Sequence, residues 1–245
     1  MNPNDNTVLV TGGGSGIGLA LAKAFSRHAG NTVIVCGRNV QKLEAVHAEN
    51  PAIAIFPCDI ANNQDQQRLI ELISKKYPKF NFLINNAGIQ HSYSFADTRS
   101  HIDLVEEEVN VNFLAQVKLT DRLLPILMQQ PSAAIVNVTS ALAVVPKQSA
   151  PIYCATKAAL RNFTKALRYQ LKNTSVKVFE IVPALVETEM TKGRGKGKIT
   201  PEALVAEAMR GIESDRYEIR IEKTKMLFVL HRLLPSVAER IIKNG

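Results

Sequence analysis

Tyr153 and Lys157 are the first two residues whose types and spacing suggest chemistry. They lie in segment 149–160 (SAPIYCATKAAL), whose small residues and early Pro151 predict a helix beginning near that proline. Residues four apart share one face of a helix, so the phenol and the ammonium would stand side by side. A neighbouring ammonium favours the phenolate and lowers the pKa of the phenol, which would suit Tyr153 to proton exchange near neutral pH. The alternative is an ordinary tyrosine contact beside a solvated lysine.

A glycine-rich turn near the amino terminus predicts a site for a nucleotide. Residues 11–18 read TGGGSGIG and stand between a first apolar strand and a first helix. Glycine lets the backbone approach a pyrophosphate closely, and the start of a helix supplies free N–H groups and a positive dipole end. The spacing is Gly-x-x-x-Gly-x-Gly, because Ile17 stands where the pattern Gly-x-Gly-x-x-Gly needs glycine.

The end of the second predicted strand indicates which nucleotide is bound. A site for NAD usually places an acidic residue there, on the ribose hydroxyls. This strand ends in Cys36, Gly37, Arg38 and Asn39, with no acid. The planar guanidinium of Arg38 suits a 2′-phosphate, so the sequence favours NADP over NAD. An ordinary exposed arginine is the alternative.

The elements that must position these residues alternate between strand and helix along the chain. Continuous apolar runs without polar alternation predict a parallel sheet buried on both faces, and the expected fold is a doubly wound, Rossmann-type, three-layer α/β/α single domain over residues 1–245. The predicted strands are 7–10, 32–36, 52–56, 80–85, 133–138, 176–182 and about 217–221. The predicted helices are 17–28, 40–49, 64–76, one or two within 101–130, 151–172, and one from about 201.

Composition narrows the class of protein. The chain has 245 residues, 46% of them apolar, and no basic, apolar amino-terminal leader, so we expect a cytoplasmic globular protein. The three cysteines and five histidines show no metal-binding spacing, so no metal is expected. The net charge is +8, but the basic run 192–198 (KGRGKGK) holds no aromatic residue for base stacking. It is expected to be a mobile, solvated loop, and no nucleic-acid partner is expected.

The segment 223–245 is basic and has apolar residues at helical spacing. Packing against the domain or against another subunit is the usual role of such a segment. Contact with a membrane surface is the less favoured alternative.

Seven motifs in order resemble the classical short-chain dehydrogenase/reductase family, from residue 7 to about residue 190. They are TGGGSGIG, Asp59 after the third strand, Asn85-Asn86-Ala87-Gly88 after the fourth, Asn112 in a long helix, Ser140 after the fifth strand, the pair Tyr153 and Lys157, and Pro183 after the sixth strand. A weaker likeness, carried by NNAGIQ, AAIVNVTS and YCATKAAL, points to the subgroup of bacterial oxidoreductases named for the lipoteichoic acid D-alanylation operon.

The resemblance implies an enzyme that moves a hydride between a nicotinamide and a carbonyl or alcohol substrate, as a homodimer or homotetramer. It implies a catalytic set of Asn112, Ser140, Tyr153 and Lys157, with Tyr153 as general acid and base. The implied cofactor contacts are Gly12, Ser15, Gly16, Ile17, Gly18, Arg38, Asp59, Ile60, Asn86, Ala87, Tyr153, Lys157, Val186 and Thr188. Two alternatives stay open: an NADP(H)-binding regulatory protein with little turnover, and an NAD-dependent alcohol dehydrogenase.

One departure from the family pattern bears on the site. Ala184 follows Pro183 where the family commonly has glycine, which puts the contacts of Val186 and Thr188 in doubt. Substrate choice is expected to come from segments 89–94, 141–148 and 187–200, the last of them a basic segment that could close as a lid. Glu106, Glu107 and Glu108 are expected to form a solvated helix face, and His91 and His101 are expected at the surface.

Overall fold

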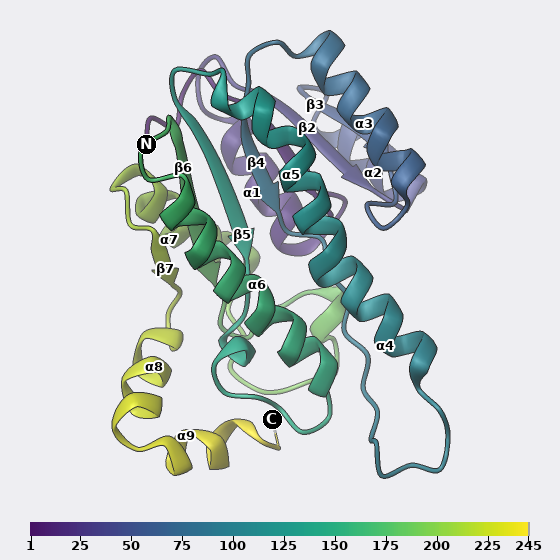
Figure 1. Ribbon diagram of the computed structural model, residues 1–245, viewed down its shortest axis with the longest axis vertical. Helices are drawn as coiled ribbons and strands as arrows, with labels where there is room; N and C mark the ends of the chain where they lie inside the picture. Colours follow the sequence, from purple (N-terminus) through teal and green to yellow (C-terminus); the bar gives the residue numbers. More distant parts are fainter. Residues whose placement is uncertain (245) are drawn as a thin grey trace.

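The computed structural model describes residues 1–244, and its seven strands form one parallel sheet in the order β3-β2-β1-β4-β5-β6-β7 (Figure 1). The strands β1, β4 and β5 at the centre of the sheet are apolar and buried along almost their whole length, because helices cover both faces. The strands are β1 (Thr7–Thr11), β2 (Thr32–Gly37), β3 (Ile53–Pro57), β4 (Phe80–Asn85), β5 (Ala133–Val138), β6 (Val176–Val182) and β7 (Glu218–Arg220).

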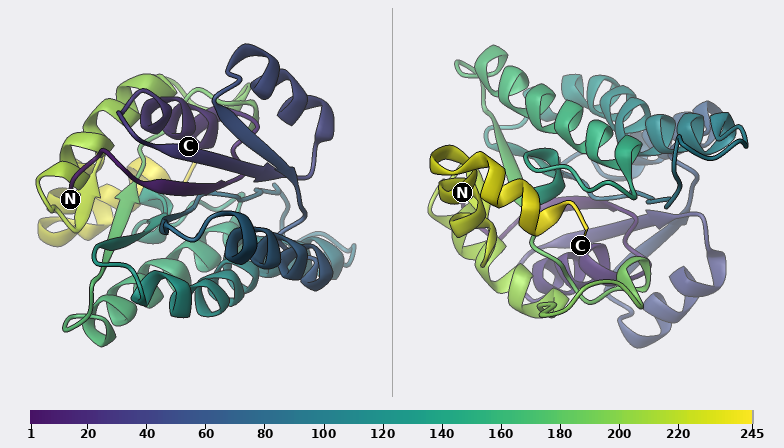
Figure 2. Two further views of the ribbon diagram at one scale, coloured as in Figure 1. Left: turned by 90° about the horizontal axis from the view of Figure 1, so that it is seen from above. Right: turned by 90° about the horizontal axis from the view of Figure 1, so that it is seen from below.

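Two helical layers enclose the sheet and define two hydrophobic cores (Figure 2, left). One layer holds α1 (Gly16–Ser26), α2 (Val40–Glu49) and α7 (Pro201–Glu213), and Phe25 of α1 packs against Phe82 of β4 with ring centroids 4.9 Å apart. The other layer holds α3 (Asn63–Lys76), α5 (Ala115–Met128) and α6 (Pro151–Gln170). The predicted doubly wound, three-layer α/β fold is confirmed.

The order of the strands reverses between β1 and β4, and this reversal sets the position of the site. The chain runs outward from β1 through β2 to β3, then returns to β4 on the other side of β1. Loops that leave the carboxyl ends of β1 and β4 in opposite directions open a crevice between them, which is where doubly wound sheets bind ligands. The glycine turn follows β1 and the segment NNAG begins at the last residue of β4, so both lie at this crevice.

The predicted helical stretch 101–130 is one long helix with a wide turn inside it. It consists of α4 (Ile102–Val109), a π-helical turn (Asn110–Leu114) and α5. A π turn holds one residue more than an α turn, and such turns are frequent at functional sites. Here the turn contains Asn112, and Pro125 lies inside α5, which ends before Pro131.

The carboxyl-terminal segment forms a helical hairpin below the carboxyl ends of the strands (Figures 1 and 2). The hairpin consists of α8 (Thr224–Leu233) and α9 (Pro235–Ile242). Phe228 holds α8 in place, because its ring lies between the guanidinium groups of Arg161 and Arg220, 4.9 and 4.2 Å from its centroid. The Lys243 carbonyl accepts a hydrogen bond from Gln148 N at 3.1 Å. Within residues 1–244, no helix has the length and apolar character needed to cross a membrane.

Candidate active site

One cavity of about 820 Å³ lies at the carboxyl ends of the strands and gathers most of the predicted site residues. The glycine turn, Arg38 and Asp59 line one end of it, Tyr153 and Lys157 line its middle, and the inner side of the α8–α9 hairpin lines the other end. Its volume is within the range of about 300–1,000 Å³ that is usual for small-molecule sites. Of the predicted residues, Gly18 and Asn112 do not line the cavity.

The backbone of the glycine turn lies against the loop that follows β4. Gly12 has a φ of 66°, and a Cβ at this position would lie 2.9 Å from the Cα of Ala87, so a side chain is excluded there. Gly18 is needed for packing, since a Cβ there would meet the Gly12 carbonyl oxygen and the Asn86 amide nitrogen at 2.4 Å. Ser15 precedes α1 and its hydroxyl makes no capping bond, which leaves it free to face a ligand. Ser15, Gly16 and Ile17, at the start of α1, line the cavity.

The Arg38 end of the cavity contains the residues predicted to meet the adenosine. Arg38 is about half exposed and its Nη1 lies 3.5 Å from Glu107 Oε1, an exposed ion pair of small energy. Asp59 accepts a hydrogen bond from Ala61 N at 2.9 Å, and Ile60 is buried beside it. Asn86 has mainly a structural role, because its amide donates to the Thr11 carbonyl at 2.9 Å.

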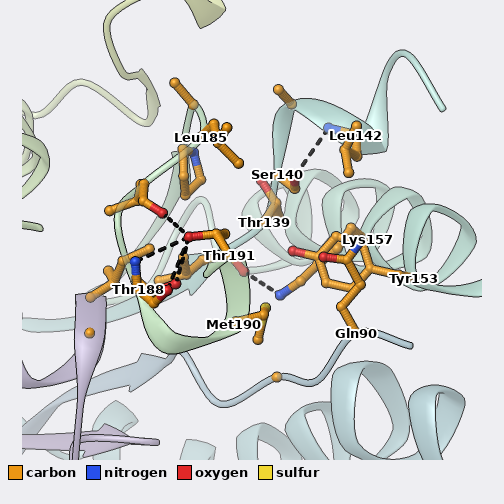
Figure 3. Close-up of a pocket in the computed structure, with 18 of the residues that line it drawn as sticks. Gln90, Thr139, Ser140, Leu142, Tyr153, Lys157, Leu185, Thr188, Met190 and Thr191 are labelled. Atoms are coloured by element: carbon orange, nitrogen blue, oxygen red, sulfur yellow. Dashed lines mark hydrogen bonds between the residues drawn. The ribbon is translucent and has the colours of Figure 1, made fainter. Parts of the chain in front are cut away.

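Tyr153 and Lys157 point into the middle of the cavity from one face of α6, as their spacing predicts. Figure 3 shows them beside Ser140, with Thr188, Met190 and Thr191 on the opposite side. The Nζ of Lys157 lies 5.8 Å from the centroid of the Tyr153 ring and donates to the Val138 carbonyl at 2.8 Å. The side chain of Lys157 is buried, so β5 and α6 together fix the ammonium.

The structure corrects the expected direction of the Tyr153 pKa. Burial raises it to about 12, and the opposing effects of the Ser140 hydrogen bond and the Arg194 charge do not offset this. Burial also lowers the pKa of Lys157 to about 8. Desolvation is the largest effect on both side chains. Tyr153 in this state holds its proton firmly.

Ser140 and Asn112 flank this pair in different ways. Ser140 Oγ accepts the N–H of Leu142 at 3.1 Å, and its own hydroxyl faces Tyr153, whose pKa it lowers. Asn112 is buried behind Gly88, where Oδ1 accepts Ile89 N at 2.8 Å and Nδ2 donates to Ile89 O at 2.9 Å. A Cβ at Gly88 would lie 3.3 Å from Asn112 Oδ1 and 3.5 Å from Lys157 Nζ, so the two groups converge there. Asn112 is therefore a positioning residue.

The turn after β6 accommodates Ala184 without strain. Ala184 is not among the non-glycine residues with positive φ, so glycine is not required at this position. Val186 and Thr188 line the cavity, and Thr188 lies across from Gly16, whose Cβ would be 3.1 Å from the Thr188 methyl group. The backbone N–H of Thr188 donates to the Thr191 hydroxyl at 3.1 Å. The predicted contacts at this turn are therefore geometrically available.

The expectation of a fully solvated glutamate triplet is wrong for Glu108. This side chain is completely buried, where it accepts His91 N at 2.8 Å and the Tyr93 hydroxyl at 3.2 Å. Its partners come from the loop after β4, and helical periodicity gives no sign of them. The imidazole of His101 is also covered, because it stacks on Tyr93 with centroids 4.8 Å apart. Glu108 thus anchors the loop that borders the cavity.

A family model described as short chain dehydrogenase matches residues 6–198. The chain belongs to the short-chain dehydrogenase family. Its relatives include an uncharacterized oxidoreductase, DltE, of Bacillus subtilis, which is 43% identical over 89% of this chain and 83% of that one. An uncharacterized oxidoreductase of Staphylococcus aureus is 31% identical over 76% of this chain and 80% of that one.

Solved structures of short chain dehydrogenases have the same fold as this chain. A short chain dehydrogenase from Burkholderia cenocepacia, solved in complex with NADP, superposes with a TM-score of 0.88 at 22% identity, over 100% of both chains. One from Burkholderia phymatum, solved in complex with NAD, has a TM-score of 0.84 at 20% identity and covers 100% of this chain and 98% of that one. The residues of this short-chain dehydrogenase within 1–244 contain no cluster of three potential metal ligands among His, Cys, Asp and Glu.

Proposed function

We propose that this short-chain dehydrogenase/reductase is NADP-dependent and reduces a small-molecule carbonyl to an alcohol, with Tyr153 as the proton donor. The observation that carries the proposal is the convergence of Ser140, Tyr153 and Lys157 in the cavity that the glycine turn opens into. The Bacillus subtilis relative is named as an oxidoreductase. Of the two structural neighbours, one was solved with NADP and the other with NAD. Assembly as a homodimer or homotetramer, cytoplasmic location and a single domain stay predictions.

The residues present fit a dinucleotide. Gly12 and Gly16 leave the space that a side chain would fill, and the start of α1 supplies N–H groups for a pyrophosphate. Arg38 and Asp59 would hold the adenosine end, while Lys157, Val186 and Thr188 would border the nicotinamide end. When bound there, the nicotinamide supplies the hydride that reaches the carbonyl carbon.

The protein must orient the carbonyl and supply its proton. The hydroxyl of Ser140, beside that of Tyr153, can turn to hydrogen-bond the carbonyl oxygen, and that bond strengthens as negative charge grows on the oxygen. Tyr153 then gives its phenolic proton to this oxygen. An alkoxide is a stronger base than a phenolate, so a phenol with a pKa of about 12 still transfers its proton downhill. The buried ammonium of Lys157 stabilises the phenolate that results.

The pH dependence of the two directions should differ. Reduction uses the protonated phenol, which predominates well below its pKa of about 12, whereas oxidation uses the phenolate. We expect alcohol oxidation to rise by about tenfold per pH unit between about pH 6 and 8. Carbonyl reduction should stay nearly constant over the same range, up to the pH of about 8 at which Lys157 loses its charge. Initial rates in both directions measure this, and parallel pH profiles would contradict the role of Tyr153.

Arg38 is proposed to bind the 2′-phosphate of NADP. A charge-assisted bond of this kind contributes about 1.5–3 kcal/mol, so Arg38→Ala should weaken NADPH binding by about 10–100-fold. NADH, which lacks the phosphate, should change less than about threefold. Fluorescence titration of both dinucleotides tests this, with Arg27→Ala as a control because Arg27 is exposed and does not line the cavity. Equal losses for the two dinucleotides would remove the assignment.

Glu107 offers a second test of the same assignment. Its carboxylate lies 3.5 Å from Arg38 and would repel a phosphate placed there. Glu107→Gln should therefore tighten NADPH binding and leave NADH unchanged. The alternative of an NAD-dependent alcohol dehydrogenase predicts no such difference. The alternative of a regulatory protein predicts tight binding of NADPH but no oxidation of NADPH when any of a panel of aldehydes and ketones is added.

A further inference from the structure

The basic loop between β6 and α7 is folded and closed. Glu187 N donates to Ile199 O at 2.8 Å and Ile199 N donates to Leu185 O at 3.0 Å, which ties the two ends together. Lys198 Nζ donates to the Thr191 carbonyl at 2.6 Å and braces the interior. Most residues of segment 192–198 are exposed, as expected of a solvated loop, but Arg194 and Lys198 are partly buried. The closed geometry places Arg194 and Lys196 at the cavity and leaves Lys192 outside it.

Arg194 and Lys196 are the cations of this loop that line the cavity, and of the two Lys196 is exposed whereas Arg194 is partly buried. Arg194 lies between Gly193 and Gly195, both with positive φ, and it lines the cavity while Lys192 is exposed outside it. Its Nη1 is buried and has no hydrogen-bond partner within residues 1–244. The guanidinium is close enough to Tyr153 for its charge to lower the pKa of that phenol. A buried donor without a partner is costly, so this group is suited to bind an acceptor from a ligand.

The acidic side chains that line the cavity do not satisfy Arg194. Among the described residues these are Asp59 and Glu189. Asp59 accepts from Ala61 N near Arg38, and Glu189 forms an ion pair with Lys42. Lys147, Lys196 and Lys223 also line the cavity, so cations outnumber carboxylates along its wall. The charge of the buried Glu108 also acts on Tyr153, but this carboxylate does not line the cavity and already accepts His91 N and the Tyr93 hydroxyl. An anionic ligand group near Tyr153 would therefore meet mainly cations along the cavity wall.

The remaining wall beyond Tyr153 is apolar and comes from the carboxyl-terminal hairpin. Leu227 and Leu230 of α8 and Ile241 of α9 face the cavity, and Leu185 and Leu142 border it from the loops. The hairpin is held in place by the two arginines around Phe228 and by the bond between Gln148 N and Lys243 O. Such a wall favours an aliphatic or aromatic body on the substrate.

We propose that the substrate is a carbonyl compound with an apolar body and a carboxylate, and that Arg194 binds the carboxylate. This specificity rests on the proposed carbonyl reduction. The planar guanidinium pairs with a carboxylate through two parallel N–H···O bonds, which fixes the orientation of the substrate as well as its charge. Arg194 thus selects keto acids and orients them for Ser140 and Tyr153, while the hairpin selects the apolar body.

A comparison of charged and neutral substrates tests the proposal. The oxo acids 5-oxohexanoate and 7-oxooctanoate and their methyl esters are assayed with NADPH on the full chain. For whichever oxo acid the wild type reduces with the higher kcat/KM, Arg194→Gln should lower kcat/KM by about 10–100-fold. The kcat/KM for the methyl ester of that acid should change by less than about threefold. Lys192→Gln removes the same charge from the exposed part of the loop and should change neither. Equal losses on acid and ester would overturn the proposal.

Binding without turnover separates this proposal from the proposed reaction. Octanoate and octanamide are titrated calorimetrically into the protein saturated with NADP. Octanoate should bind the wild type at least about tenfold more tightly than octanamide, and Arg194→Gln should remove that difference. Equal affinities for the wild type would overturn the proposal even if neutral ketones are reduced. A loss of NADPH affinity in Arg194→Gln would overturn it too, since Arg194 would then hold the cofactor. If no ketone is reduced but octanoate is preferred, the carboxylate site stands and the proposed reaction fails.

Discussion

Replacing Tyr153 by phenylalanine is expected to lower kcat for carbonyl reduction by about 10³-fold. General acid catalysis by a positioned side chain contributes about 10²–10⁴-fold, and this change removes the proton while it keeps the ring. The cavity keeps its shape, because the ring packs on α6 beside Lys157 and only the hydroxyl is lost. The affinity for NADPH should stay within a few-fold. Stopped-flow single turnovers and fluorescence titrations measure the two quantities separately.

The control for this change lies on the same helix. Tyr169 is exposed and outside the cavity, so Tyr169→Phe should leave both kcat and NADPH affinity unchanged. Loss of NADPH binding in Tyr153→Phe would show that the hydroxyl serves the cofactor rather than the carbonyl. Retained turnover would show that the proton comes from another group, and the mechanism above would be wrong.

Replacing Lys157 by methionine should give a protein that is more stable and nearly inactive. Burial lowers the pKa of Lys157 to about 8, so the charged form is disfavoured in the folded state. Compared with the usual value of about 10.4, this is a cost of about 3 kcal/mol at neutral pH. Lys157→Met removes this cost but also loses the hydrogen bond to the Val138 carbonyl, which destabilises the variant by about 1–2 kcal/mol. The net gain in the free energy of unfolding should be about 1–2 kcal/mol.

The pH dependence of stability gives this prediction a second readout. The unfolded state binds more protons than the folded state between about pH 8 and 10.4, so the stability of the wild type rises with pH in that window. Lys157→Met removes this rise, and kcat should fall by about 10²–10³-fold because the phenolate loses its stabilising charge. Urea titrations at several pH values measure the first effect. Lys165→Met, on the exposed side of α6, should change neither quantity, and a destabilised Lys157→Met would contradict the assigned cost of burial.

Much of the fold follows from local patterns in the sequence. Continuous apolar runs predicted the strands to within one or two residues, because a parallel strand buried on both faces has little room for polar residues. The pairing of Tyr153 with Lys157 followed from helical geometry alone. The glycine turn was also placed correctly, because its position after the first strand restricts what it can do.

What the sequence could not give depends on partners that are distant along the chain. Three consecutive glutamates look solvated, and only the loop that carries His91 and Tyr93 shows that Glu108 is buried. Arg194 looks like one charge in a solvated run until the loop around it closes. The pKa of Tyr153 was misjudged for a similar reason, since spacing reports the neighbouring ammonium and does not report how far water is excluded.

The π-helical turn at Asn110–Leu114 makes the orientation of α4 sensitive to insertions and deletions in this part of the chain. A helix advances by about 100° per residue, so the extra residue sets the rotational phase of α4 relative to α5. Deleting one residue there would leave the core face of α5 in register and would swing Glu107 and Glu108 away from Arg38 and Tyr93. Insertions and deletions at this turn would therefore change both the surroundings of Arg38 and the anchoring of the loop after β4, while leaving the sheet untouched.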